Sequence, residues 1–328
     1  MRVLLSDVAE ARHGGRIRAA LPGVELVPVA PEGPLPDTAG IGMAFVSRDL
    51  FLGGTRFRLT ERFQRFVALI LAAPDLRRVQ TFSAGTDMAP YQAMRARGIE
   101  VVGASGASAP AVAQAAIAGL LALARRLPRV MEAQARHAWE PIYGEGEPPD
   151  LASQTALIVG TGPIGQEIAR LATAFGLTPI GIRRDGTAPP PPHFAEAASY
   201  AALPGWLPRA HWLILACPLT ETTRNLIDAA ALALLPPGAG LVNVSRGGVA
   251  DEAALLAALR SGDLAGAFLD VFTEEPLPSG SAFWDLPNVI VSPHSAAAGE
   301  GLAERVAAIF CDNLRRWAAE SRGEKPTR

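Results

Sequence analysis

The stretch Ala156-Leu-Ile-Val-Gly-Thr-Gly-Pro-Ile-Gly165 decides the fold. Its apolar residues run without alternation into glycines at 160, 162 and 165, which is typical of a parallel strand that is buried on both faces and followed by a turn. In such a turn Gly160 permits the sharp bend, Gly162 lets the backbone approach a pyrophosphate, and Gly165 allows the next helix to pack closely on the strand. A helix-like pattern follows, and the unpaired N–H groups of its first turn would face the phosphates. The stretch therefore favours dinucleotide binding over an ordinary strand–helix turn.

Length and composition are those of a globular protein with two domains. The chain has 328 residues, of which 49% are hydrophobic and 19% charged, and this is enough for two substantial cores. A formal net charge of −2 gives no reason to expect nucleic acid or an anionic membrane as a partner. Cys217 and Cys311 show neither metal-ligand spacing nor a disulfide framework, so we expect no metal site and a reducing, cytoplasmic location. The N-terminal apolar core is too short for a signal peptide, and the most apolar helix, expected over Ala111–Ala124, is too short to span a membrane.

Strands alternate with helices along the whole chain, which predicts parallel sheets. In the first part of the chain we expect helices over 59–71 and 91–97 and strands at Val3–Leu5, Val24–Val29, Met43–Val46, Val79–Phe82 and Ile99–Val102. From residue 151 we expect strands at Thr155–Val159, Thr178–Ile182, Trp212–Ala216, Gly240–Val244, Ala267–Leu269 and Val289–Val291.

Residues that follow these strands are placed to bind a cofactor, because ligands of an open α/β sheet lie outside the carboxyl ends of its strands. Cys217 and Pro218 follow one such strand. Arg183 and Arg184 follow the strand after the glycine turn, where an NAD-binding chain carries Asp or Glu. Two guanidinium groups there suit a 2′-phosphate, so NADP is favoured over NAD. The alternatives are that Asp185 binds the ribose of NAD, or that both arginines are merely solvated.

Four more polar residues follow later strands. Arg246 precedes two glycines and can bind a carboxylate through two parallel hydrogen bonds while polarising a neighbouring carbonyl. His294 follows the last strand, and Asp270 and Glu275 follow the strand before it. A carboxylate beside an imidazole fixes its tautomer and raises the pKa of such a ring, which suits proton transfer near neutral pH. Each residue taken singly is better explained as structural, so the interpretation depends on the set.

The motifs that contain these residues resemble those of NAD(P)-dependent D-isomer-specific 2-hydroxyacid dehydrogenases. They are Val242-Asn-Val-Ser-Arg-Gly-Gly248, Leu269-Asp-Val-Phe-Thr-Glu-Glu-Pro-Leu-Pro278 and Asn288-Val-Ile-Val-Ser-Pro-His294, in that order after the glycine turn. The resemblance covers nearly the whole chain and is clearest from Val79 onward. With no regulatory domain after Arg328, the chain resembles the glyoxylate/hydroxypyruvate reductases more than the longer phosphoglycerate dehydrogenases.

The resemblance implies a fold and an assembly. The fold is α/β, with a Rossmann dinucleotide-binding domain inserted in a smaller flavodoxin-like α/β substrate domain. The substrate domain is expected over residues 1–99 and 294–328, and the cofactor domain over 100–293. A homodimer is expected from the resemblance and from the apolar surface of Ala111–Ala124.

The resemblance also implies roles for matching residues. Arg246 would bind the substrate's carboxylate and carbonyl, His294 would be the general acid/base, and Glu275 would hold His294, with Glu274 as the competing candidate. The substrate carboxylate would be received by the backbone of Ser83, Ala84, Gly85 and Thr86. Asp270 would bind the nicotinamide carboxamide. The implied cofactor-binding residues are Gly160, Thr161, Gly162, Pro163, Ile164, Gly165, Arg183, Arg184, Cys217, Pro218, Asn243, Val244, Ser245 and Asp270.

The expected function is hydride transfer between NAD(P)H and a small 2-oxo acid, giving a D-2-hydroxy acid. Oxidation of phosphoglycerate or phosphite within the same family is an alternative, and a cofactor-sensing binding protein of the corepressor type is another. The side chains that select the substrate stay open. Arg48, Phe51, Tyr143 and Trp284 are candidates, and each is equally explained as a packing or surface residue.

Overall fold

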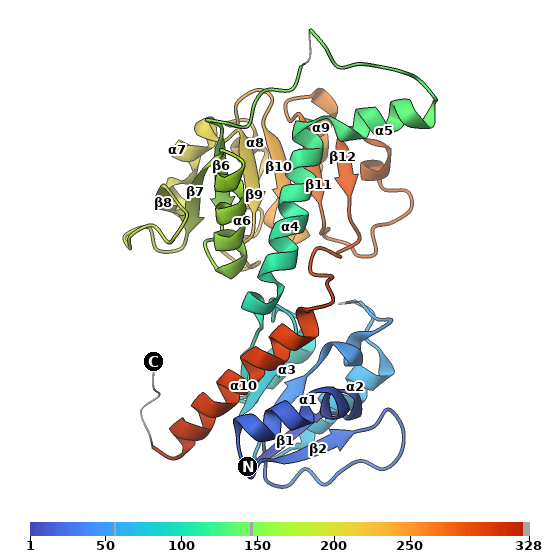
Figure 1. Ribbon diagram of the computed structural model, residues 1–328, viewed down its shortest axis with the longest axis vertical. Coiled ribbons are helices and arrows are strands. Elements are labelled where there is room, and N and C mark those ends of the chain that lie inside the picture. Colours follow the sequence, from blue (N-terminus) through green and yellow to red (C-terminus); the bar gives the residue numbers. More distant parts are fainter. Residues whose placement is uncertain (56, 145–146, 324–328) are drawn as a thin grey trace. The chain divides into compact units, whose positions relative to one another are not determined.

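The computed structural model describes residues 1–55, 57–144 and 147–323 (Figure 1). The chain divides into two compact units. Unit 1 comprises Met1–Ser108 and Gly299–Arg328, and unit 2 comprises Ala109–Ala298. These divisions, after Ser108 and Ala298, lie nine and five residues beyond the limits at 99 and 293 that we expect from the sequence.

Unit 1 is built on a five-stranded parallel sheet with the order β2-β1-β3-β4-β5. This is a flavodoxin-like strand order. The strands are β1 (Arg2–Ser6), β2 (Glu25–Val29), β3 (Ile41–Val46), β4 (Arg78–Thr81) and β5 (Glu100–Val102), and the helices are α1 (Asp7–Ala20), α2 (Glu61–Ala72), α3 (Ala89–Ala96) and α10 (Leu302–Ser321).

Both faces of this sheet are covered, because successive side chains of a strand point to opposite faces. Val3 and Leu5 of β1 belong to the apolar core that α1 and α10 share, in which the rings of Phe45 and Phe310 stack with centroids 4.5 Å apart. Leu4 belongs to the opposite core, with α2 and α3. The pattern of apolar residues thus determines which helices cover which face.

Unit 2 is built on a seven-stranded parallel sheet with the order β12-β11-β10-β9-β6-β7-β8. The strand order reverses between β6 and β9, which is the switch point of a Rossmann sheet. Together the two sheets confirm the predicted α/β class. The strands are β6 (Thr155–Val159), β7 (Thr178–Arg183), β8 (Glu196–Ser199), β9 (Trp212–Leu215), β10 (Gly240–Asn243), β11 (Gly266–Leu269) and β12 (Val289–Val291).

Helices cover both faces of the unit 2 sheet (Figure 1). Ala156 and Ile158 of β6 pack with α4 and α6 on one face, whereas Leu157 and Val159 pack with α7, α8 and α9 on the other. The helices of this unit are α4 (Ser105–Ala124, which begins in unit 1), α5 (Leu127–Ala135), α6 (Pro163–Ala174), α7 (Leu203–Trp206), α8 (Ala229–Leu232) and α9 (Glu252–Ser261).

Helix α4 is longer than the sequence predicts. It begins at Ser105 and continues through Pro110, because its first turns are held by tertiary contacts. Ala107 is buried in the core of unit 1, and Arg305 Nε donates to its carbonyl oxygen at 2.7 Å. The expectation that the helix is too short for a membrane span is therefore wrong. Among the described residues it is the one helix long and apolar enough for a span. However, 56% of its apolar window is buried in the fold, and core helices of soluble proteins pass the same test.

Candidate active site

The turn after β6 is built around Gly160. This residue has φ +108°, where an L side chain is strained, and its N–H donates to the carbonyl oxygen of Ile182 at 2.7 Å. A Cβ on Gly160 would lie 2.6 Å from the carbonyl carbon and oxygen of Ala216. A Cβ on Gly165 would lie 1.9 Å from the carbonyl oxygen of Gly160. Both positions therefore exclude a side chain, one because the chain turns sharply and the other because α6 packs directly on the turn.

Gly162 differs from its two neighbours, because it faces open space. It is the N-cap of α6, with φ −71°, and a Cβ there would meet no atom within 4 Å. The first N–H groups of a helix have no acceptor within the helix and carry the positive end of its dipole. Gln166 Nε2 donates to the carbonyl oxygen of Thr161 at 3.0 Å and holds the turn. The chain here fits the pyrophosphate of a dinucleotide, with a rigid turn, open space and available donors.

The two arginines at the end of β7, of which Arg183 is the last residue of the strand, have different environments. Arg183 folds back on its own loop, where Nη2 donates to the carbonyl oxygens of Ala188 and of Pro189, the second at 3.0 Å. Its Nε is buried without a hydrogen-bond partner. Arg184 is exposed. One guanidinium is thus held at the end of β7 and the other is accessible to solvent.

Asp185, the alternative partner for a ribose, also turns toward its own loop. Its Oδ1 accepts from the N–H of Thr187 at 2.9 Å and from the Thr187 hydroxyl at 2.6 Å. The hydroxyl bond, followed by the backbone bond, lowers the pKa of Asp185. The carboxylate is therefore charged and oriented within a local turn.

The loop after β9 lies against the glycine turn. A Cβ on Gly160 would be 2.7 Å from the backbone nitrogen of Cys217. The Cys217 thiol is buried, and burial raises its pKa to about 12. The carbonyl oxygen of Pro218 accepts from the hydroxyl of Thr223 at 2.6 Å. The two loops on either side of the switch point are thus packed together.

The Asn243 side chain shapes the loop that carries Arg246. Asn243 Oδ1 accepts from the N–H of Ser245 at 3.0 Å and from its hydroxyl at 2.7 Å, and Asn243 Nδ2 donates to the carbonyl oxygen of Arg246 at 3.1 Å. Arg246 Nη1 donates to the carbonyl oxygen of Ser245 at 2.7 Å. A Cβ on Gly247, the next residue, would lie 2.1 Å from the carbonyl carbon of Phe272, so this loop packs on the loop after β11. The side chains of Asn243 and Ser245 therefore form hydrogen bonds within this loop.

Asp270 connects the end of β11 to the loop after β12. Its carboxylate, which is 2% exposed, accepts from the hydroxyl of Ser292 at 2.5 Å, from the N–H of Ser295 at 2.8 Å and from the N–H of Ala296 at 3.1 Å. Burial raises the pKa of Asp270, and these donors act against the rise. The carbonyl oxygen of Asp270 also accepts the N–H of His294 at 2.9 Å. Asp270 therefore holds the segment around His294.

His294 and Glu275 form a pair. His294 Nδ1 lies 2.8 Å from Glu275 Oε2, and Glu275 Oε1 accepts from the N–H of Phe272 at 3.0 Å. The side chain of Glu275 is 10% exposed and that of His294 39%, so the carboxylate is shielded while the ring reaches solvent. His294 has φ +53°, a left-handed conformation that is uncommon outside glycine and recurs at functional sites. Glu274, the competing acid, is exposed.

The Ser83–Thr86 loop belongs to unit 1 and follows β4. The Ser83 N–H donates to Thr81 Oγ1 at 3.0 Å, and its hydroxyl donates to the carbonyl oxygen of Gly85 at 2.7 Å. Arg95 donates to the carbonyl oxygen of Thr86 at 2.7 Å and to its hydroxyl at 2.6 Å. The loop is therefore fixed by side chains of its own unit.

The side chains suggested as substrate contacts have varied surroundings. Phe51 is a packing residue, since its ring centroid lies 4.4 Å from that of Phe63. Arg48 lines a small cavity of unit 1. Trp284 is about half exposed and donates to the carbonyl oxygen of Pro278 at 2.9 Å, while Tyr143 is exposed. Within the described residues, no group of three or more His, Cys, Asp or Glu could hold a metal ion.

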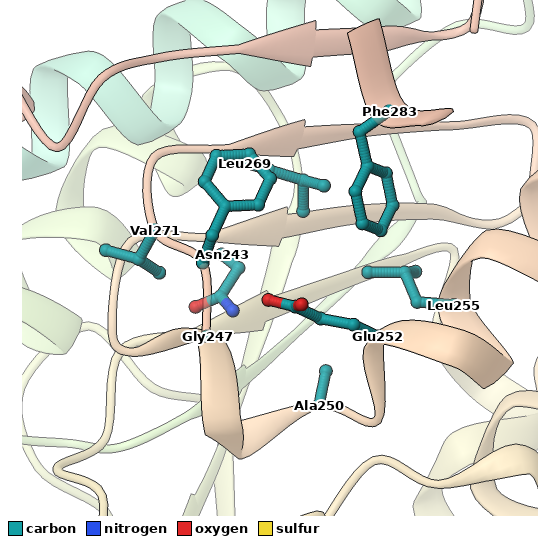
Figure 2. Close-up of a pocket in the computed structure, with 9 residues that line it drawn as sticks. Asn243, Gly247, Ala250, Glu252, Leu255, Leu269, Val271 and Phe283 are labelled. Atoms are coloured by element: carbon teal, nitrogen blue, oxygen red, sulfur yellow. The ribbon is translucent and has the colours of Figure 1, made fainter. Parts of the chain in front are cut away.

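One acidic residue beside the site has no counterpart in the predicted set. Glu252 opens α9, and its Oε1 accepts the N–H of Thr273 at 2.5 Å. Figure 2 shows this carboxylate turned toward Asn243 at the end of β10, among residues that include Gly247 and Val271 of the neighbouring loops. The sequence gives no clear sign of this contact of Glu252, because an acidic residue in the first turn of a helix is common.

Comparison with known proteins identifies the family. Residues 117–296 match the model of the "D-isomer specific 2-hydroxyacid dehydrogenase, NAD binding domain". A glyoxylate reductase of Korarchaeum cryptofilum is 36% identical over 264 residues, 78% of this chain and 76% of its own. A solved D-isomer specific 2-hydroxyacid dehydrogenase of Xanthobacter autotrophicus, in complex with NADPH, is 30% identical, with a TM-score of 0.75 and coverage of 100% of this chain and 97% of its own.

A second solved structure is similar to the same extent. The NADPH-dependent glyoxylate/hydroxypyruvate reductase of Sinorhizobium meliloti, in complex with NADP and sulfate, is 28% identical, with a TM-score of 0.74. The likeness covers 98% of this chain and 96% of that protein. The chain therefore belongs to the D-isomer specific 2-hydroxyacid dehydrogenases, NAD(P)-dependent oxidoreductases that act on a CH–OH group.

Proposed function

We propose that the protein reduces a small 2-oxo acid of the glyoxylate or hydroxypyruvate type to its D-2-hydroxy acid, with NADPH as the preferred donor. The observation that carries the proposal is the contact of His294 Nδ1 with Glu275 Oε2 at 2.8 Å. This contact lies at the carboxyl edge of the unit 2 sheet, the same edge at which Arg246 follows β10. The names of similar proteins, glyoxylate reductase and NADPH-dependent glyoxylate/hydroxypyruvate reductase, support this substrate class.

The chain's own part in the reaction is to move one proton. Glu275 Oε2 accepts a hydrogen bond from Nδ1–H of His294. This bond fixes the ring, so that Nε2 is the nitrogen that acts as the acid toward the substrate. In the reducing direction Nε2 gives its proton to the carbonyl oxygen of the substrate, and in the oxidising direction it takes the hydroxyl proton back. When bound, the nicotinamide supplies or accepts the hydride.

Substrate orientation is assigned to two elements. Arg246 would bind the carboxylate through its planar guanidinium and polarise the carbonyl, and the hydrogen bonds of Asn243 support it by fixing its backbone. The backbone of Ser83–Thr86 is the substrate-binding segment that we propose in unit 1. We accordingly take unit 1 as the substrate unit and unit 2 as the cofactor unit.

The preference for NADP rests on the arginines after β7. Exposed Arg184 and loop-bound Arg183 place positive charge where a 2′-phosphate is expected, while Asp185 is engaged by its own turn. Replacing both arginines with alanine should weaken NADPH binding by about 2 kcal/mol or more, and NADH binding much less. Arg170→Ala, an exposed arginine of α6, is the matched control. Equal losses for both cofactors would refute this assignment.

We also propose a cytoplasmic homodimer. More than half of the apolar window of α4 is buried inside the chain, so this helix gives little support for a partner subunit. Helix α5 and the segment after it do expose large apolar side chains, with Trp139 at 93%, Tyr143 at 82% and Met131 at 67%. A second copy that covers them would remove this surface from water. Light scattering should give a molar mass twice that of the chain. In Trp139→Ser the measured mass should fall toward that of the monomer.

The proposed reaction is tested by turnover. Glyoxylate, hydroxypyruvate and bulkier 2-oxo acids are offered with NADPH and with NADH, and 3-phosphoglycerate and phosphite with the oxidised cofactors. We expect the two small oxo acids to give the highest kcat/KM. His294→Ala should lower kcat by about 10²–10⁴ with cofactor affinity near normal. Cofactor binding without turnover of any compound would instead identify a sensing protein.

A further inference from the structure

We propose that Glu252 is a positioning residue for the His294–Glu275 pair, acting through the peptide between Phe272 and Thr273. The inference rests on the proposed function, since it concerns the orientation of that pair. Glu252 lies outside the set of motif residues that carry the chemistry. Its contact is with the backbone that presents Glu275.

The loop from β11 to Glu275 is held by two carboxylates in succession. Glu275 Oε1 accepts the N–H of Phe272 at 3.0 Å, and Glu252 Oε1 accepts the next N–H, that of Thr273, at 2.5 Å. The first bond orients the carboxylate whose other oxygen lies 2.8 Å from His294 Nδ1. The N–H of Phe272 belongs to the preceding peptide, which shares the Cα of Phe272 with the peptide that Glu252 holds. A displacement of the Phe272–Thr273 peptide that shifts this Cα would therefore move Glu275 and lengthen its bond to the imidazole.

The same peptide is packed from a second direction by the loop of Arg246. A Cβ on Gly247 would lie 2.1 Å from the carbonyl carbon of Phe272 and 2.2 Å from the nitrogen of Thr273. Gly247 lets the two backbones touch, and Glu252 supplies a directional bond to the peptide. The loop that carries Arg246 and the loop that carries Glu275 are thus joined at one peptide, and Glu252 fixes its orientation.

Glu252 is a rigid anchor for this purpose. It is the first residue of α9, after the N-cap Asp251, whose carboxylate accepts the N–H groups of Ala253 and Ala254. Leu255 and Leu259 bury the same helix in the core of unit 2. Figure 2 shows Glu252 with Asn243 and Gly247 among the residues that line a small pocket. A charged oxygen on a packed helix holds an amide more firmly than solvent does.

The test compares three substitutions at this position. Glu252→Ala removes the acceptor and should lower kcat about tenfold, because small misplacements of catalytic groups carry large rate losses. The KM for the oxo acid and the Kd for NADPH should stay within about twofold, since neither ligand is assigned to Glu252. Glu252→Gln keeps an oxygen that can accept the Thr273 N–H and should restore most of the rate. Glu252→Asp, one methylene shorter, should fall between them.

Asp251→Ala is the matched control, because it removes a carboxylate from the same turn of α9 but none from the Thr273 N–H. It should lower the melting temperature and lower kcat much less than Glu252→Ala does, because the Thr273 N–H keeps its acceptor. If Glu252→Ala has the kcat of the unsubstituted protein, or if Glu252→Gln is as slow as Glu252→Ala, the proposal is overturned. The Asp and Gln variants keep the test open should the Ala variant not fold.

A double-substitution cycle shows whether Glu252 acts through Glu275. In a Glu275→Gln background, Glu252→Ala should cost little further rate, because the pair it orients is already impaired. A full tenfold loss in both backgrounds would mean that Glu252 acts elsewhere, and the proposal fails. The proposed function fails separately, if His294→Ala and Glu275→Gln both retain full kcat.

Discussion

The three glycines of the β6–α6 turn should respond differently to the same substitution, Gly→Ala. At Gly160 the new Cβ would meet the Ala216 backbone at 2.6 Å in a residue with φ +108°. At Gly165 it would lie 1.9 Å from a carbonyl oxygen, inside a helix. At Gly162 it would meet nothing within 4 Å, and φ of −71° suits any residue. Gly160→Ala and Gly165→Ala should therefore destabilise the apo fold, whereas Gly162→Ala should only occupy space that the cofactor needs.

The expected magnitudes follow from these contacts. Gly160→Ala combines backbone strain of about 1–3 kcal/mol with overpacking of about 1–3 kcal/mol. Gly165→Ala carries a similar overpacking cost, offset by up to about 1 kcal/mol of helix propensity. Gly162→Ala changes an N-cap and should cost below about 1 kcal/mol. A unit of this size loses about 2–4 °C per kcal/mol, so Gly160→Ala should lower its melting temperature by roughly 4–24 °C.

Two measurements on each variant check this reasoning. Thermal unfolding of the apo protein, followed by circular dichroism, should rank the variants Gly162, Gly165, Gly160 from most to least stable. Titration with NADPH, followed by its fluorescence, should show at least a tenfold weaker Kd for Gly162→Ala, about 1.4 kcal/mol. Wild-type affinity in Gly162→Ala would mean that no phosphate lies at this turn. An unchanged melting temperature in Gly160→Ala would refute the packing argument.

Further predictions concern buried groups. Burial raises the pKa of Cys217 to about 12 and that of Cys311 above its usual value, so at pH 8 both are almost entirely thiols. A thiol-reactive dye should label the native protein slowly and both cysteines after unfolding; rapid native labelling would contradict this. Gly119→Ala would place a Cβ 2.3 Å from Cγ of Phe268 and should destabilise by about 1–3 kcal/mol in urea titrations. Asp270→Ala leaves the buried N–H of Ala296 and the part-buried N–H of Ser295 without their acceptor and should cost roughly 2–5 kcal/mol by the same assay.

The strands of unit 2 could be predicted because burial on both faces leaves a simple pattern. All six expected strands occur, each within one residue of its expected ends. The seventh, β8 at the sheet edge, was not predicted, because an edge strand that reads Glu-Ala-Ala-Ser has no apolar run. Helix α1 is difficult to predict from sequence for a similar reason. Gly14 and Gly15 interrupt it and few of its residues are apolar, so its formation depends on the Ser6 cap and on packing against α10.

The candidate site could be predicted as a set of strand ends, but not as a set of contacts. Parallel strands bring the residues that follow them to one edge, so Arg246, Asp270 and His294 could be grouped from sequence. Choosing Glu275 over Glu274 from the residues alone was not possible, because the two are adjacent. The fold distinguishes them, since Glu275 lies 2.8 Å from the imidazole and Glu274 is exposed.

Asp251 and Glu252 show why contacts of this kind are not visible in a sequence. Both are acids at the start of one helix, where either could cap N–H groups or offset the dipole. Asp251 does so, whereas Glu252 reaches the N–H of Thr273, 21 residues further along the chain. That contact exists because Gly247 lets the loop after β11 come within reach of α9. The position of Glu275 is thus set by residues whose partners depend on tertiary packing, and local residue patterns do not contain that information.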